Sequence, residues 1–180
     1  MGASMEYKRL EREDLGGVAD LDRQERIDVI YEQRGVDLHE RPGSWNSPGW
    51  DPHGTHDHSV AAQRQALEHY VDAGGIALGA LADGRLVGIG VVVPHVRPEI
   101  AQLAFLHVDA AFRATGIGRR LSDELDCIAR DAGATQIVVS ATPSQNTVRF
   151  YLARGYVVTD RPLPELYELE PEDVHLRKAL

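Results

Sequence analysis

The sequence predicts a mixed α/β domain in which helices cover a central sheet. The first observation is a change of hydrophobic period along the chain, from helical spacing to strand alternation and back. The second is the order of the segments: one strand, two helices, a three-strand meander, a helix, a strand, a helix and two strands. The third is bulk composition. A chain of 180 residues with 43% hydrophobic and 26% charged residues is typical of one soluble globular domain and excludes disorder or fibrous structure.

The first half of the chain predicts one strand, two helices and a long loop. A short strand is expected over residues 6–10, and apolar residues at helical spacing predict a helix over residues 14–33. This periodicity is lost over residues 35–58, which carry both tryptophans and four of the eight histidines. A connection of this length is typically a functional lid or a disordered segment, and we interpret it as a substrate lid. Residues 59–73 predict a second helix, which a Gly-Gly pair ends.

The second half alternates strands and helices. Its expected strands cover residues 76–82, 85–93, 100–108, 136–141, 156–159 and 173–177, and its expected helices cover residues 116–132 and 144–154. The Asp83-Gly84 pair between the first two strands is a strong signal for a two-residue hairpin turn. In the helix over residues 116–132, apolar residues recur at helical spacing and form one stripe.

Charge and cysteine content exclude several classes of protein. The chain has 19 Lys and Arg residues and 28 Asp and Glu residues, a formal net charge of −9, so nucleic acid and anionic membranes are poor partners. No apolar run approaches the ~20 residues that span a bilayer, and the N-terminus lacks a secretory signal. Cys127 is the one cysteine, so we expect no disulfide within the chain and a cytoplasmic location. The second methionine, Met5, indicates that residues 1–4 are a leftover of cloning.

A glycine turn between a strand and a helix is the most informative local feature. Gly116 and Gly118 let the backbone approach a ligand closely, and the first amides of the following helix have no partner within it. Such a turn can bind a pyrophosphate, and the side chains of Arg113 and Arg119 add positive charge there. The turn matches neither a Walker A loop nor a dinucleotide-binding fingerprint, because the required lysine and third glycine are missing.

Two motifs together resemble the GNAT superfamily of acyl-CoA-dependent N-acyltransferases. Arg113-x-x-Gly116-x-Gly118 matches the superfamily's Arg/Gln-x-x-Gly-x-Gly/Ala signature. Residues 146–156, with an Asn, a Phe-Tyr pair and a Gly-aromatic pair, resemble its second signature. The resemblance implies one domain over residues 5–180. It also implies a mostly antiparallel sheet of six to seven strands, splayed between the fourth and fifth strands and flanked by about four helices.

The resemblance implies acetyl-CoA as co-substrate. The residues it places around CoA are Leu106, Val108, Arg113, Ala114, Thr115, Gly116, Ile117, Gly118, Arg119 and Asn146. The amides of residues 114–118 would hold the pyrophosphate, with the side chains of Arg113 and Arg119 assisting. Main-chain groups of Leu106 and Val108 would pair with the pantetheine arm, which Asn146 would also contact. The Leu106 amide would polarise the thioester carbonyl.

Amine attack on a thioester needs a donor near the sulfur and an acceptor for the amine proton. The resemblance assigns the donor role to Tyr151, and a phenol with a pKa near ~10 can protonate a thiolate. The base is not evident, because Gln102 and Ala104 stand where some relatives carry Glu or His. Glu99 is our candidate, with a residue of the first helix, a loop histidine or a water chain as alternatives. In a regular strand, His107 would face away from Gln102.

Acceptor-side residues are expected on the first helix and the following loop, which commonly wall the acceptor site in this superfamily. Asp22 and Glu25 could form an acidic wall that orients a cationic amine, and Tyr31 lies near the end of the same predicted helix. Trp50 and His53 could position the substrate when the loop closes. An ordinary solvated face is the alternative for the acidic residues.

The segment His53-x-x-His56-x-His58 also raises the question of a metal. Imidazole and carboxylate groups can bind zinc, but no second ligand group stands at a standard spacing. We therefore expect no metal.

The sequence thus predicts an N-acetyltransferase that transfers the acetyl group of acetyl-CoA to a primary amine of a small molecule by direct attack in a ternary complex. A non-catalytic acyl-CoA sensor, a ligand-sequestering protein and a protein N-acetyltransferase are the alternatives. The resemblance also raises a homodimer as an expectation.

Overall fold

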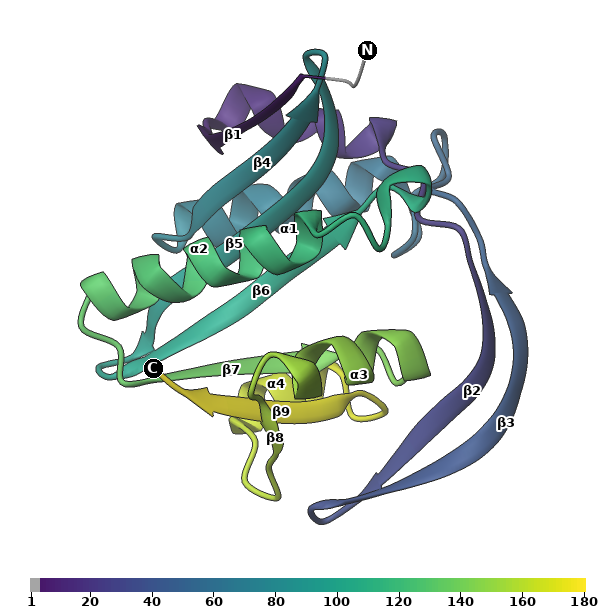
Figure 1. Cartoon of the computed structure of the whole chain (residues 1–180), viewed down its shortest axis with the longest axis vertical. Helices are drawn as coiled ribbons and strands as arrows, with labels where there is room; N and C mark the ends of the chain where they lie inside the picture. Colours follow the sequence, from purple (N-terminus) through teal and green to yellow (C-terminus); the bar gives the residue numbers. More distant parts are fainter. Residues whose placement is uncertain (1–3) are drawn as a thin grey trace.

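The computed structural model describes residues 4–180, and Figure 1 shows its ribbon. Residues 1–3 lie outside the described residues, and with them most of the segment predicted to be a leftover of cloning.

The fold is a mixed α/β arrangement around a seven-stranded sheet, which confirms the predicted class. The strands are β1 (Met5–Leu10), β4 (Ile76–Ala82), β5 (Arg85–Arg97), β6 (Ile100–Val108), β7 (Gln136–Ala141), β8 (Val157–Val158) and β9 (Val174–Ala179). They lie in the order β1-β4-β5-β6-β7-β9-β8. Each neighbouring pair is antiparallel except β6 and β7, which are parallel. β4 and β5 are long apolar runs rather than alternating ones, because both faces of these strands are buried inside the sheet.

Helices cover both faces of the sheet (Figure 1). On one face lie α2 (Ile117–Asp131) and α3 (Gln145–Ala153), whose apolar residues share a core with β7 and β9. On the other face lie the 3₁₀ helix η1 (Arg12–Asp20) and α1 (Val60–Asp72), which form a second core with β1, β4 and β5. Two short helices, η2 (Ala110–Phe112) and α4 (Pro164–Leu169), lie in connections.

Two predictions for the first half are wrong. The segment over residues 14–33 is not one helix, because η1 ends at Asp20 and a strand, β2 (Glu25–Arg34), follows. The segment over residues 35–58 is not a loop throughout, because β3 (Asp37–Ser47) pairs antiparallel with β2. Two adjacent glycines weaken the helix, while β-branched and aromatic residues favour a strand in β2. Gly35, at φ 62°, makes the tight turn between the two strands.

The sheet opens between β6 and β7. These strands pair only where residues 100–102 face residues 136–138, and beyond that point they diverge, as Figure 1 shows. The expected splay is thus present, at the junction that the resemblance named as fourth and fifth strands. The β2–β3 hairpin arches past the divergent ends of the two strands (Figure 1).

Candidate active site

The edge of β6 presents main-chain groups to the opening. The Asp109 N–H donates to Val87 O, on the β5 side, at 2.9 Å. Hydrogen-bonding groups alternate in direction along a strand, so those of Val108 and Leu106 point to the opposite edge, toward β7. The Arg113 Nε donates weakly to the Val108 carbonyl, at 3.4 Å. The two residues expected to pair with a pantetheine arm therefore face the space between the strands.

A β-bulge at Ala104 changes which side chains share a face of β6. Val91 pairs with Phe105 and Val92 with Leu103, so Ala104 is an extra residue between them. Gln102 therefore lies on the same face as His107, and the expectation for a regular strand is wrong for this pair. The bulge lies beside the point where β6 leaves β7. A substrate bound between the two strands would contact β6 there.

The glycine turn presents a set of unpaired amides. Gly116 has φ 92° and precedes the first residue of α2, and Ala114 also has a positive φ of 61°. Among residues 4–180, the amides of residues 114–118 donate to no protein acceptor. No acidic residue stands in the first turn of α2. A cradle of free N–H groups at a helix N-terminus is suited to a pyrophosphate. A Cβ on Gly118 would lie 3.4 Å from Val108 Cγ2 and 3.5 Å from the Phe150 ring, so the turn packs closely on its neighbours.

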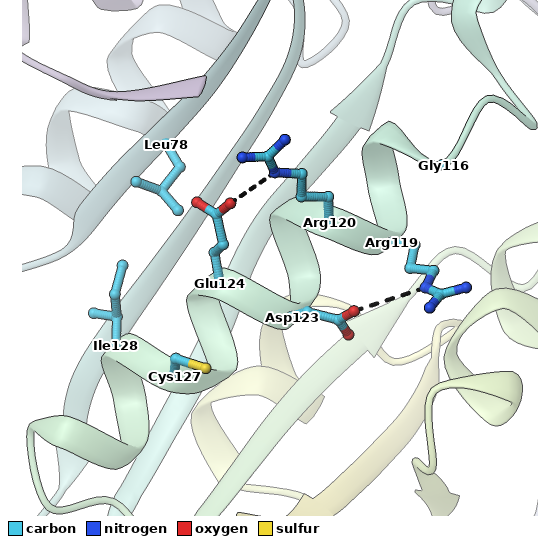
Figure 2. Close-up of a pocket in the computed structure, with 8 residues that line it drawn as sticks. All are labelled: Leu78, Gly116, Arg119, Arg120, Asp123, Glu124, Cys127 and Ile128. Carbon is cyan, nitrogen blue, oxygen red and sulfur yellow. Dashed lines mark hydrogen bonds and ion pairs between the residues drawn. The ribbon is translucent and has the colours of Figure 1, made fainter. Parts of the chain in front are cut away.

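The two arginines near the turn point in different directions. Arg119 lies on the exposed side of α2 and pairs with Asp123 at 3.8 Å, as Figure 2 shows. It borders an open groove of about 680 Å³ that runs along α2 from Gly116 to Ile128. Arg113 turns toward β2, where its Nη1 donates to Gln24 O at 2.8 Å. Arg113 therefore belongs to the rim between the turn and the β2 hairpin.

β2 joins both sides of the opening. On the β6 side, the Ala110 N–H donates to Asp22 O at 2.8 Å, just before β2 begins. On the β7 side, the Tyr31 N–H donates to Pro143 O at 2.8 Å. The Asn146 Nδ2 donates to Glu25 Oε1 at 2.8 Å, beside a cavity of about 90 Å³ lined by residues 25–29 and 144–146. Two residues predicted for different substrates, Asn146 for CoA and Glu25 for the acceptor, are thus in direct contact.

Tyr151 lies on α3 and is 6% exposed. Its ring packs edge-on against Phe150 and Tyr156, with centroids 5.2 Å and 5.3 Å away. Burial, and secondly the negative charge of Asp173, raise the pKa of Tyr151 well above the ordinary value of a phenol. At neutral pH the hydroxyl therefore keeps its proton, and the raised pKa makes it a weaker acid than an ordinary phenol.

Comparison with protein families decides the relationship. The sequence matches the acetyltransferase (GNAT) domain over residues 51–165, more than half of the chain. The chain belongs to the GNAT acetyltransferase family. It is an acyl-CoA-dependent N-acetyltransferase, with acetyl-CoA as co-substrate. No curated protein matches it in a search by sequence.

Solved structures share the fold of this GNAT protein over its whole length. A nourseothricin acetyltransferase superposes with a TM-score of 0.72 at 18% identity, covering 97% of this chain and 98% of the other. A Bacillus anthracis protein described as a streptothricin acetyltransferase, solved with acetyl coenzyme A, gives 0.72 at 15% identity and covers 98% and 99%. The PaiA N-acetyltransferase of Thermoplasma acidophilum, solved with coenzyme A, gives 0.64 at 16% identity and covers 98% and 99%. At these identities the likeness concerns the fold.

Three further predicted site residues of this GNAT protein lie in separate places. Glu99 precedes β6 at the end where β6 and β7 pair, on the order of 20 Å along the strand from Leu106 and Val108. That position gives no support to Glu99 as the base. Asp22 is exposed and accepts from the Gln24 N–H at 2.9 Å, which fixes the chain before β2. His53 is exposed in the irregular segment before α1.

The other acceptor-side predictions lie closer to the opening. Tyr31, on β2, donates its hydroxyl to Glu40 of β3 at 3.1 Å. Trp50 is partly buried and packs its ring edge-on against His107 of β6, with centroids 5.5 Å apart. The irregular segment around residues 48–59 therefore reaches the sheet through Trp50.

Sequence reasoning missed three residues of this GNAT protein that line the region. Arg23 stacks over the Trp50 ring, with its Cζ 4.4 Å from the centroid. Burial, then Arg23 and Arg113, lower the pKa of His107 to about 4, so its imidazole is neutral at pH 7. Asp173 accepts from Ser140 Oγ at 3.2 Å, and burial, then Glu170, raise its pKa to about 7. The bulge and the β2 hairpin create the surroundings of His107 and Arg23, and neither has a local sequence signal.

The structure also bears on the histidine-rich segment and on membrane association. Within residues 4–180, no group of three or more His, Cys, Asp or Glu side chains is arranged to hold a metal ion. No helix in the described part of the chain combines the length and hydropathy needed to cross a bilayer.

Proposed function

We propose that this acetyltransferase transfers the acetyl group of acetyl-CoA to a primary amine on a small molecule, by direct attack in a ternary complex. One observation carries the proposal: β6 and β7 part beyond residues 102 and 138, with free amide donors in the turn after β6 and Tyr151 on the helix after β7. Direct transfer needs both substrates together between the two strands.

The glycine turn and the edge of β6 would bind CoA. The amides of residues 114–118 would donate to the pyrophosphate, which the positive end of α2 also favours. Main-chain groups of Leu106 and Val108 would pair with the pantetheine arm, as one strand edge pairs with another extended chain. Acetyl-CoA supplies a thioester whose carbonyl carbon is electrophilic. The Leu106 N–H would donate to the carbonyl oxygen as negative charge develops on it.

Proton transfer would involve groups from α3 and β2. The amine nitrogen forms a bond with the carbonyl carbon, and the carbon–sulfur bond breaks. Tyr151 would give its proton to the departing sulfur. Glu25, held by Asn146 at 2.8 Å, would accept the proton that leaves the nitrogen, directly or through one water. This assignment replaces Glu99 with a residue that the structure holds at the mouth of the opening.

The small-molecule acceptor is supported by the names of structures that share the fold. The nourseothricin and streptothricin acetyltransferases that share the fold are named for small-molecule amines. The test is calorimetric titration with acetyl-CoA, followed by thiol release across amines and across peptides with free N-termini or lysines. Turnover confined to the peptides would refute a small-molecule acceptor.

The non-catalytic alternatives are distinguished in the same assay. A sensor or sequestering protein would bind acetyl-CoA and release no thiol with any amine beyond the rate without protein. A homodimer and a cytoplasmic location stay predictions, which sedimentation and cell fractionation would test.

A further inference from the structure

Arg23 is a partly buried cation whose protein contacts are all neutral. It lies between η1 and β2, with its guanidinium over the Trp50 ring. Its Nη2 donates to Ser47 Oγ at 2.7 Å, and its Nη1 contacts His58 Nδ1 at 2.9 Å. Burial, and secondly the charge of Arg23, lower the pKa of His58, so this imidazole is neutral and accepts the contact.

A second unpaired cation lies near the first. Neither Arg23 nor Arg113 takes part in any ion pair formed within residues 4–180. Burial, and secondly the charge of Arg113, lower the pKa of Arg23, so the two guanidinium groups act on one another. Arginine stays charged in proteins, and two neighbouring unpaired guanidinium groups in a chain of net charge −9 need an explanation.

The Trp50 side chain adds an unused donor at the same place. Its Nε1 is buried and has no hydrogen-bond partner among the described residues. A buried indole N–H usually finds an acceptor, because leaving it unpaired costs free energy. The neighbouring His107 contributes no charge, because its imidazole is neutral. Arg23 and Arg113 thus donate only to neutral acceptors, and the Trp50 N–H beside them has no acceptor among the described residues. Two cations without a negative partner and one free donor form a group that suits an oxyanion.

These donors lie on the acceptor side of the sheet. Trp50 and Phe105 pack with the core formed by η1 and α1, whereas α2 and its glycine turn pack on the opposite face. The Arg113 contact with Gln24 O brings this group to the rim of the opening. Glu25, two residues along the chain, acts in the opposite sense to burial and Arg113 and raises the pKa of Arg23.

We propose that the acceptor amine carries a carboxylate, which Arg23 binds together with Arg113 and the Trp50 Nε1. The substrate class is then a primary amine of the amino-acid type, with its carboxylate at Arg23 and its nitrogen toward Glu25. The opposite charges of Arg23 and Glu25 match the two ends of such a molecule. This inference rests on the proposed function and narrows its acceptor.

The test compares each standard amino acid with its amide, which has no negative charge, and each kcat/KM is expressed per neutral amine because the amide lowers the pKa of that amine. For the amino acid that the wild-type protein acetylates best, kcat/KM is expected to be about 10- to 100-fold higher than for the corresponding amide. That ratio is the range of a charge-assisted hydrogen bond. Arg23→Gln is expected to bring this preference close to one, chiefly by raising KM for the acid. Trp50→Phe keeps the ring and removes the N–H, and is expected to lower the preference in part. Arg9→Gln, at an exposed arginine of β1, is the control and should leave the preference unchanged.

Three outcomes would overturn the inference. Equal kcat/KM for acids and amides in the wild-type protein would refute the carboxylate while leaving the proposed function standing. An Arg23→Gln protein that loses affinity for CoA in calorimetry and keeps its preference would show that Arg23 serves a CoA phosphate. Retention of the full preference in folded Arg23→Gln protein would exclude Arg23 from the site. If thermal unfolding shows that Arg23→Gln does not fold, Arg23→Lys replaces it, because lysine keeps the charge and loses the planar fork.

A binding measurement separates this inference from the proposed function. In a Trp45→Phe background, Trp50 is the remaining tryptophan, and its fluorescence reports directly on the site. Amino acids that change this fluorescence where their amides do not, without any turnover, would support the carboxylate site and refute the acetyl acceptor role of these amines. No fluorescence change and no turnover with any amino acid would refute the carboxylate site.

Discussion

Replacing Gly116 with alanine tests whether the glycine turn holds CoA. Gly116 has φ 92°, and a Cβ at this position would meet no atom within 4 Å. The substitution therefore adds backbone strain without a clash, at a cost of about 1–2 kcal/mol in the free energy of unfolding. In a chain of this size each kcal/mol lowers Tm by roughly 2–4 °C. Relief of the strain requires the turn to move, and the loss of one charge-assisted amide bond would weaken CoA binding about 10- to 150-fold.

Gly84→Ala is a matched control for this experiment. Gly84 has φ 84° in the β4–β5 hairpin, and a Cβ there would likewise meet no atom within 4 Å. Both variants should lose similar stability in urea unfolding, and only Gly116→Ala should lose CoA affinity in calorimetry. If the two variants bind CoA as tightly as the wild-type protein, the turn is structural and the assignment of its amides to the pyrophosphate is refuted.

Three other substitutions address catalysis, stability and pH dependence. Tyr151→Phe should lower kcat for thiol release by about 100-fold or more while the Kd for CoA stays unchanged, and an unchanged kcat would exclude the acid role. Lys178→Met leaves Asp126 buried without its ion-pair partner and should cost about 3–5 kcal/mol in urea unfolding; adding Asp126→Asn should restore part of this loss. The pKa of Asp173 is raised to about 7, so the folded state binds more protons than the unfolded state and stability should fall as pH rises from ~4 to ~7. Asp173→Asn should remove that fall in unfolding measured at pH 5 and pH 8, and parallel pH profiles of the two proteins would contradict it.

The strands, turn and helix proposed to bind CoA were predictable because their signals are local. The apolar runs of β6 and β7 begin and end at the residues expected for them, since strands inside a sheet are marked by their own hydrophobicity. The glycine turn begins α2 where expected, because Gly116 supplies the positive φ of the residue before the helix. Two short motifs then identified the family, and the family match covers the same part of the chain.

The acceptor side was not predictable because its structure depends on distant pairing. Residues 25–34 carry apolar residues at a spacing that also suits a helix, and only their pairing with residues 37–47 makes them a strand. The family match begins at residue 51, so no motif covers this hairpin. The bulge at Ala104 likewise has no sequence signal, since it is defined by the register of β6 against β5. Arg23 was therefore placed within a helix, and its stacking on Trp50 was not foreseen.

The central sheet and β2 are held in place by different contacts, and this difference suggests which residues determine the choice of acceptor. β5 is fixed by burial in the core, whereas Ile27 is the one buried residue of β2. β2 is held instead by polar contacts at the far side of the opening, where the Gln33 amide donates to Thr159 O and accepts from the His175 N–H, both at 2.8 Å. Substitutions in β2 therefore disturb few core contacts and can change the acceptor without disturbing the glycine turn. We expect them to change KM for the amine, and substitutions in the turn to change affinity for CoA.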